Sequence, residues 1–105
     1  MTRRVVRVQD VFYDDLDRQL GPERGPGERP SSTDFLRFDL VPLIELIAEG
    51  FDQLPEALPG HPEYRILVTS GRLVPRVSIL AMRAPDGSVE LIQLDLDLSP
   101  GAGSA

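Results

Sequence analysis

The chain has 105 residues, a net charge of −6 and no cysteine, and these values exclude several classes of protein. An acidic chain does not bind nucleic acid through its overall field, and a chain without cysteine has no disulfide framework. No apolar run approaches the roughly 20 residues needed to span a bilayer, and the start MTRRVVRV lacks the apolar region of a signal peptide. We therefore expect a cytoplasmic protein with one domain over residues 1–98 and a disordered tail over residues 99–105.

The first twenty residues change from a strand pattern to a helix pattern. Residues 4–8 (RVVRV) are rich in valine, which predicts a short strand near the edge of a sheet. Residues 9–20 carry apolar side chains at steps of three and four, which predicts a helix that ends before Gly21 and Pro22. The aspartates of this segment lie off the apolar stripe, so they favour a solvated helix face over a cation site.

A glycine- and proline-rich loop separates this helix from a second one. Residues 21–32 (GPERGPGERPSS) form no periodic pattern, and a loop of this length is either functional or mobile; we expect a flexible loop. Residues 32–54 carry a helical apolar stripe, capped by Ser32 or Thr33. Because proline disrupts a helix interior, Pro42 predicts either a kink or a helix that starts near Asp39.

The connector after the second helix contains the only histidine, His61, between two prolines. A single histidine with no second ligand or catalytic partner in sequence does not predict a metal site or a catalytic site. The sequence therefore predicts no cofactor and no metal.

Residues 64–98 predict three consecutive antiparallel strands. A two-residue Asp86-Gly87 loop would place one apolar face on the core, and a Pro85-Asp86 turn would preserve that face. The pairs expected on this face are Ala81 with Ile92, Ile79 with Leu94 and Val77 with Leu96. For the preceding hairpin, a Ser70-Gly71 loop would place Val68 opposite Leu73 and Ile66 opposite Pro75, on the core side.

The opposite face of this sheet is the predicted site, because it mixes apolar and charged side chains. Such a face is less polar than a solvated sheet face should be, which indicates a surface for a partner. Arg65 and Arg76 either form a surface network with Asp95 and Asp97 or bind a phosphate or carboxylate of a partner. The residues expected on this face are Arg65, Leu67, Val74, Arg76, Leu80, Met82, Leu91, Gln93, Asp95 and Asp97.

The order of strand, two helices and a three-stranded antiparallel meander, with the segment FDQLPEALPGHPEYRILV, resembles the RelE/ParE superfamily of small bacterial toxins. The resemblance implies an α+β fold whose sheet face is blocked by an antitoxin. It also implies cleavage of ribosome-bound messenger RNA in the RelE branch and action on gyrase in the ParE branch. Arg65 matches the arginine of the family's second strand, and Arg76 and Arg83 correspond to third-strand positions.

Two functional hypotheses follow. The first is a toxin-like module that binds a protein or RNA target through its arginines; because the chain is acidic and Tyr64 is expected on the core side, we expect binding without a general base. The alternative is a non-catalytic interaction domain that forms a homodimer through Leu67, Leu80, Met82 and Leu91. A small molecule in the cleft between helices and sheet would leave no separate pattern in the sequence. In either of the first two cases we expect a homo-oligomer or a hetero-complex and no membrane partner.

Overall fold

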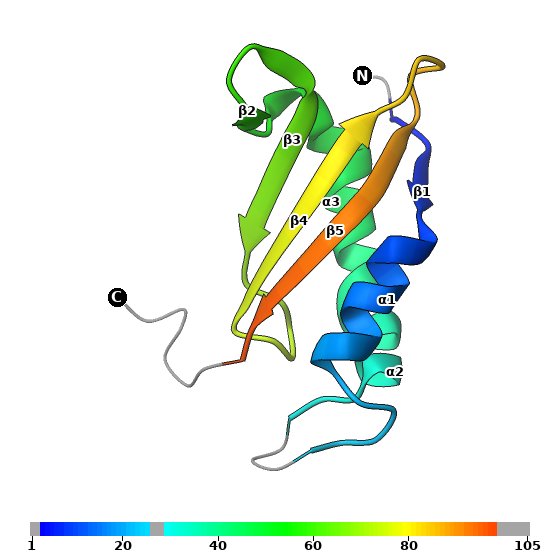
Figure 1. The fold of residues 1–105 in the computed structure, drawn as a ribbon, viewed down its shortest axis with the longest axis vertical. Coiled ribbons are helices and arrows are strands. Elements are labelled where there is room, and N and C mark those ends of the chain that lie inside the picture. The colour runs from blue at the N-terminus through cyan, green and yellow to red at the C-terminus, as the bar shows by residue number, and fades with distance from the viewer. Residues whose placement is uncertain (1–2, 26–28, 99–105) are drawn as a thin grey trace.

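The structure, a computed structural model, describes residues 3–25 and 29–98, so the expected tail 99–105 lies outside the described residues. A short strand, two helical segments and antiparallel strands follow one another, which confirms the predicted α+β fold (Figure 1). The elements are β1 (Val6–Val8), α1 (Asp10–Gln19), α2 (Ser32–Asp34), a π-helical segment (Phe35–Leu40), α3 (Val41–Gly50), a 3-10 turn (Phe51–Gln53), β2 (Glu56–Leu58), β3 (His61–Thr69), β4 (Arg76–Arg83) and β5 (Val89–Asp97).

The strands form one mixed sheet in the order β1-β5-β4-β3-β2. The predicted meander is present as β3, β4 and β5, and β1 lies at the edge as predicted, parallel to β5. The sequence did not predict β2, which lies in the proline-bearing connector and pairs with the start of β3 through a turn at Gly60. Gly60 has a φ of +82°, a conformation that glycine adopts without steric cost.

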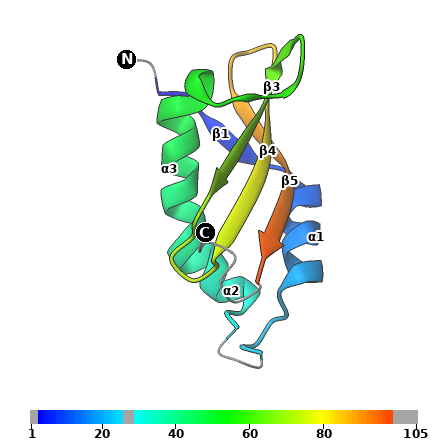
Figure 2. The ribbon, with the colours of Figure 1, turned by 90° about the vertical axis from the view of Figure 1, so that its left-hand side faces the viewer.

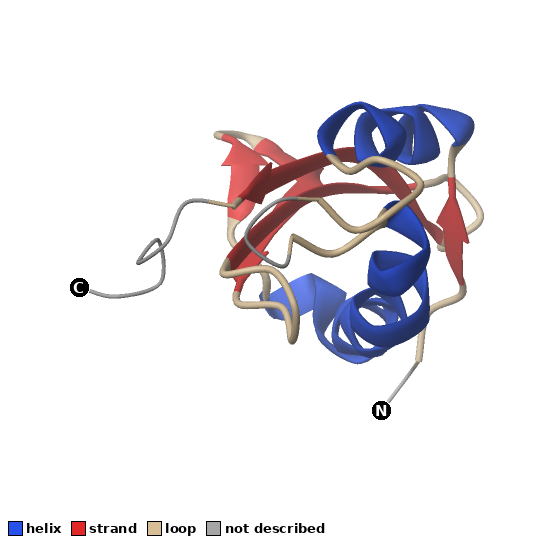
Figure 3. Cartoon of the chain, turned by 90° about the horizontal axis from the view of Figure 1, so that it is seen from below, coloured by secondary structure: helices blue, strands red, loops and turns tan. Residues whose placement is uncertain are grey.

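One face of the sheet is buried against the helices. In Figure 2, α3 lies along one side of the strands and α1 lies beside β5, and Figure 3 shows the strands as one layer with helices next to it. Burial of apolar side chains contributes roughly 25 cal/mol per Å² and is the main source of stability here. The core side chains are Phe12, Leu16, Leu20, Phe35, Leu40, Leu43, Ile47, Phe51, Val74, Val77, Ile79, Ala81, Val89, Leu91 and Leu94.

The second helical region begins at Ser32 and not near Asp39. Its cap is Ser31, one residue before the predicted caps, and Asp34 completes a capping box with it. The chain then widens into the π-helical segment directly before α3, whose second residue is Pro42. Because a proline lacks the N–H that a regular helix needs and its ring clashes with the preceding turn, the wider turn accommodates Pro42 within one continuous helical region.

The hairpin between β4 and β5 has a three-residue loop instead of the predicted two-residue loop. The N–H of Ala84 donates to the carbonyl of Ser88 at 2.7 Å, and Gly87 has a φ of +88°. An odd loop length shifts the pairing by one residue next to the turn, so that Ala81 faces Leu91 and not Ile92.

A β-bulge restores the predicted pairing further along the same two strands. The register shifts between Leu80 and Ala81, and beyond that point Ile79 faces Leu94 and Val77 faces Leu96, as predicted. The prediction for Leu91 on the open face was therefore wrong, because the side chain of Leu91 is fully buried on the core side.

The predicted pairing of β3 with β4 was wrong, and it placed the side chains of β3 on the wrong faces of the sheet. Ile66 pairs with Leu80 and Val68 pairs with Ser78, where the sequence predicted Pro75 and Leu73 as their partners. Since side chains alternate along a strand, Arg65 shares the core side with Ala81, its partner on β4.

A buried carboxylate explains the wrong register. Asp39 accepts hydrogen bonds from the backbone N–H groups of Arg72 at 2.7 Å and of Leu73 at 3.1 Å. The chain between β3 and β4 is thereby held as a loop over residues 70–75, not as the predicted tight Ser70-Gly71 turn. No local sequence pattern predicts this contact, because its partners lie more than thirty residues apart.

Candidate functional site

The open face of the sheet holds an apolar groove of about 560 Å³. Its walls come from β2, β3, β4 and β5, whose side chains on this face are half-buried or exposed. None of the described helices contributes a residue to its lining. The lining residues are Ala57, Leu58, Tyr64, Ile66, Ser78, Leu80, Gln93 and Asp95.

The centre of the groove is a row of cross-strand partners. Ile66 on β3 faces Leu80 on β4, and Leu80 faces Gln93 on β5. Tyr64 faces Met82 one step further along, so apolar side chains run across two strands of this face. Leu58 of β2 is 50% exposed at the end of the groove and extends the apolar surface beyond β3.

Acidic side chains dominate the β5 side of this face. Asp95 is exposed and faces Ser78, and Glu90 is half-buried opposite Met82. Arg76 is the arginine at the far end of β4, and it faces Asp97 across the sheet. The open face therefore combines an apolar centre with a rim that carries more negative than positive charge.

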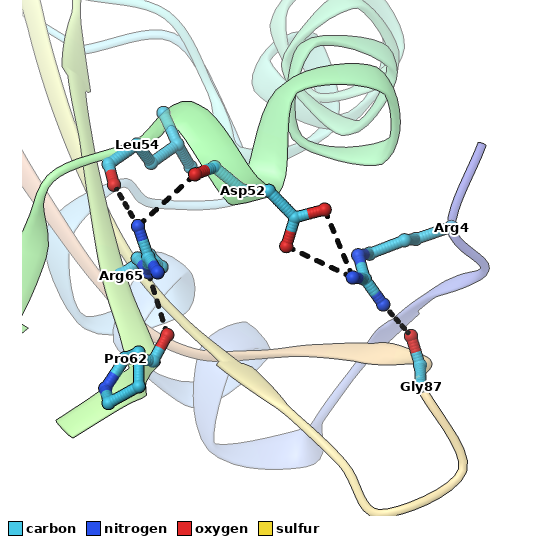
Figure 4. Close-up of polar contacts among 6 residues, drawn as sticks. All are labelled: Arg4, Asp52, Leu54, Pro62, Arg65 and Gly87. Atoms are coloured by element: carbon cyan, nitrogen blue, oxygen red, sulfur yellow. Dashed lines mark hydrogen bonds and ion pairs between the residues drawn. The ribbon is translucent and has the colours of Figure 1, made fainter. Parts of the chain in front are cut away.

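Arg65 lies on the other face of the sheet, which corrects the predicted arginine pair. Its guanidinium donates to the backbone carbonyl oxygens of Pro62 at 2.7 Å, Leu54 at 2.7 Å and Asp52 at 3.3 Å (Figure 4). The carbonyls of Asp52 and Leu54 belong to the end of the helical region, where backbone acceptors lack partners within the helix. Arg65 thus joins the helix end to β3, and it does not lie beside Arg76.

Arg4 performs a similar role at the same end of the molecule. It donates to both carboxylate oxygens of Asp52 at 3.0 Å and to the carbonyl of Gly87 at 2.8 Å (Figure 4). The guanidinium carbons of Arg4 and Arg65 lie 5.7 and 5.9 Å from the centre of the Phe51 ring. Both arginines therefore support the fold around a buried aromatic ring, with a cation–π contribution.

The remaining predicted residues divide between the two faces. Leu80 and Met82 lie on the open face, as predicted. Leu67 faces Ile79 and packs against the core, so its predicted place was wrong. Arg83 faces the buried Val89 at the end of β4, on the core side of the strand alternation.

Sequence reasoning missed Tyr64, Ile66 and Leu58 as residues of the open face. The alternation of β3 was visible in the sequence, but which half of it faces the core depends on the register with β4. The β-branched Ile66 and Val68 resembled core residues. The loop anchored by Asp39 sets a register that places them on the open face instead.

The single histidine of the chain lies beside a carboxylate of the same strand. His61 lies 3.1 Å from Glu63; the His61 side chain is largely exposed to solvent, and that of Glu63 is 36% exposed. No three histidine, cysteine or carboxylate side chains gather as metal ligands among residues 3–25 and 29–98. In the same residues, no helix is long and apolar enough to cross a membrane.

Comparisons with protein-family models, with curated proteins and with solved structures found no match. The resemblance to the RelE/ParE superfamily therefore stays a prediction, and the groove with its acidic rim is the basis for a functional proposal.

Proposed function

We propose that this chain is a non-catalytic protein-interaction domain that binds a protein partner on the open face of its sheet. The observation that supports it is the apolar groove beside Tyr64, Ile66 and Leu80. The solvent-exposed face of an antiparallel sheet normally carries polar side chains. An apolar surface rimmed by polar residues is instead typical of a partner site.

The charges of the rim favour a particular partner. Asp95 and Glu90 lie on the β5 side of the face, and the whole chain carries a charge of −6. Like charges across an interface weaken binding, whereas complementary charges speed encounter and fix the orientation. The partner therefore presents apolar side chains flanked by lysine or arginine. Face-to-face pairing of two copies, the arrangement predicted for the homodimer, would bring two acidic rims together.

Binding of two synthetic peptides tests this proposal. Both peptides have the same apolar centre, and one is flanked by lysines while the other is flanked by glutamates. We expect the basic peptide to bind at least about tenfold more tightly at low ionic strength, with NMR shifts at Tyr64, Ile66 and Leu80. Equal binding of both peptides, or shifts centred on another surface, would overturn the proposal.

A pair of variants checks the location. Leu80→Asp places a carboxylate in the groove and should abolish binding of the basic peptide. Leu46→Asp is the matched control, because Leu46 is 53% exposed on α3, away from the groove. It should bind the peptide as the unmodified chain does.

The toxin-like function remains a second proposal. It is supported by the order of elements and by Arg76, which is exposed on the open face. Its support is weaker than for the interaction domain, because Arg65 is occupied with backbone carbonyls. Growth arrest on expression in bacteria that disappears in Arg76→Ala would favour it, and harmless expression of a folded protein would count against it.

A further inference from the structure

The two edges of the sheet differ in how far their outward backbone groups are covered. On one side, β1 pairs with the first part of β5, and α1 then covers the rest of that strand. The side chain of Asp15 accepts from the N–H of Leu94, and Gln19 donates to the carbonyl of Leu94 and accepts from the N–H of Leu96. These side chains occupy the backbone groups with which another strand could pair.

The opposite edge is covered only in part. β2 pairs with β3 at His61 and Arg65, and the N–H of Ile66 still donates to the carbonyl of Pro55 at 3.1 Å. Beyond Ile66, none of the described strands lies on the outer side of β3, and Figure 1 shows β2 beside one end of β3 only. The edge from Leu67 to Thr69 thus lacks the kind of cover that α1 gives to β5.

Val68 is the centre of this uncovered edge. Backbone N–H and carbonyl groups alternate between the two sides of a strand, so those of Val68 point outward like the N–H of Ile66. The side chain of Val68 is 46% exposed on the open face. An outward-facing, β-branched edge residue between the uncharged Leu67 and Thr69 is suited to pairing with another strand.

The charges at the two ends of β3 favour a second copy of the chain as that strand. Glu63 lies near the start of β3, Glu56 lies on the neighbouring β2 opposite Arg65, and Arg72 is exposed just after the end of β3. The segment 64–84 contains four arginines and no acid. When two such edges run antiparallel, the basic end of each copy meets the acidic end of the other.

We propose that two copies of the chain join edge to edge, with β3 of one copy antiparallel to β3 of the other and Val68 opposite Val68. In this arrangement the loop with Arg72 of each copy lies against Glu56 of the other. The twofold axis of such a pair is perpendicular to the sheet, so both apolar grooves lie on the same face of one continuous sheet. The dimer offers a double binding surface, and it does not need the face-to-face contact that the acidic rims oppose.

Sedimentation velocity of the full chain with a proline variant tests the edge. Val68→Pro removes an outward N–H and leaves the pairing with β4 intact, so we expect a folded monomer. Val68→Thr keeps the N–H and the branched side chain and should remain dimeric. Circular dichroism and binding of the basic peptide establish that each variant is folded; if Val68→Pro does not fold, Val68→Lys replaces it, because two facing lysines repel.

A charge exchange tests the orientation. Arg72→Glu or Glu56→Arg alone should weaken the dimer about tenfold, since each change replaces two attractions with two repulsions. The double variant should regain the affinity of the unmodified chain. Its failure to regain the affinity would overturn the antiparallel pairing.

The Leu80→Asp variant separates this inference from the proposed function. An edge dimer should persist in Leu80→Asp although peptide binding is lost. A dimer that is lost in Leu80→Asp and retained in Val68→Pro would be a face-to-face dimer, and a monomeric unmodified chain at high concentration would equally overturn the edge pairing.

Discussion

The carboxylate of Asp15 accepts a hydrogen bond from the backbone N–H of Leu94 at 3.0 Å, so a helix side chain takes a position at the edge of β5 where a strand would otherwise pair. The two residues lie 79 positions apart, and their contact fixes α1 against the last strand. This hydrogen bond is also the main reason that the pKa of Asp15 lies below its ordinary value, with Arg18 adding to the effect and burial opposing it.

Asp15→Asn should reduce the free energy of unfolding at pH 7 and reduce it less at acidic pH. A carboxyl whose pKa is lower in the folded state stabilises the fold above its unfolded pKa of about 3.9, and this contribution is lost as the pH falls through the lower folded pKa. Urea unfolding at pH 7 and pH 3 measures the difference. Asp14→Asn, at an exposed position of the same helix, is the control, and an equal pH dependence in both variants would contradict the assignment.

Arg65→Ala should destabilise the fold by about 2 kcal/mol, because it leaves helix-end carbonyls without their charged donor. The matched control is Arg76→Ala, which removes an exposed arginine on the open face and should change stability by less than about 0.5 kcal/mol. Thermal unfolding followed by circular dichroism compares the two. Equal effects would mean that Arg65 does not join the helix end to β3.

Asp39→Ala should cost about 3 kcal/mol of stability, since the backbone N–H groups of Arg72 and Leu73 would lose their buried acceptor. Gly71→Ala should also disturb the contact between Asp39 and this loop. A Cβ at Gly71 would lie 2.7 Å from Oδ2 of Asp39, so the loop has to shift. Hydrogen exchange of residues 70–75 measures the loosened loop, and unchanged protection in Asp39→Ala would refute this role.

Gly87→Ala should destabilise the β4–β5 hairpin by about 1 kcal/mol, because an alanine is strained at a φ of +88°. The new methyl group would meet only the end of Arg4 at 3.7 Å, so the cost comes from the backbone. Gly50→Ala is the control: apart from its chain neighbours and the backbone of its own helix, no atom of the described residues lies within 4 Å of the added Cβ, and its φ of −123° is accessible to alanine. Denaturant unfolding should show loss of stability in the first variant only.

The sequence predicted the order and type of the main elements because short-range patterns determine them. The step of three and four between Phe12, Leu16 and Leu20 indicates a helix wherever that helix packs. The alternation of Val77, Ile79 and Ala81 likewise identified the buried face of β4, and all three are fully buried.

Tertiary structure decided which side chains of each neighbouring strand face the groove. A strand has a period of two, so one residue of register changes every side chain from one face to the other. The loop held by Asp39 sets a register of β3 in which Arg65 lies on the core side and not on the open face. The shift in register between β4 and β5 places Leu91, which was expected on the open face, in the core. The sequence by itself determined that a sheet with one apolar outer face exists; long-range contacts determined that Tyr64, Ile66 and Leu80 form it.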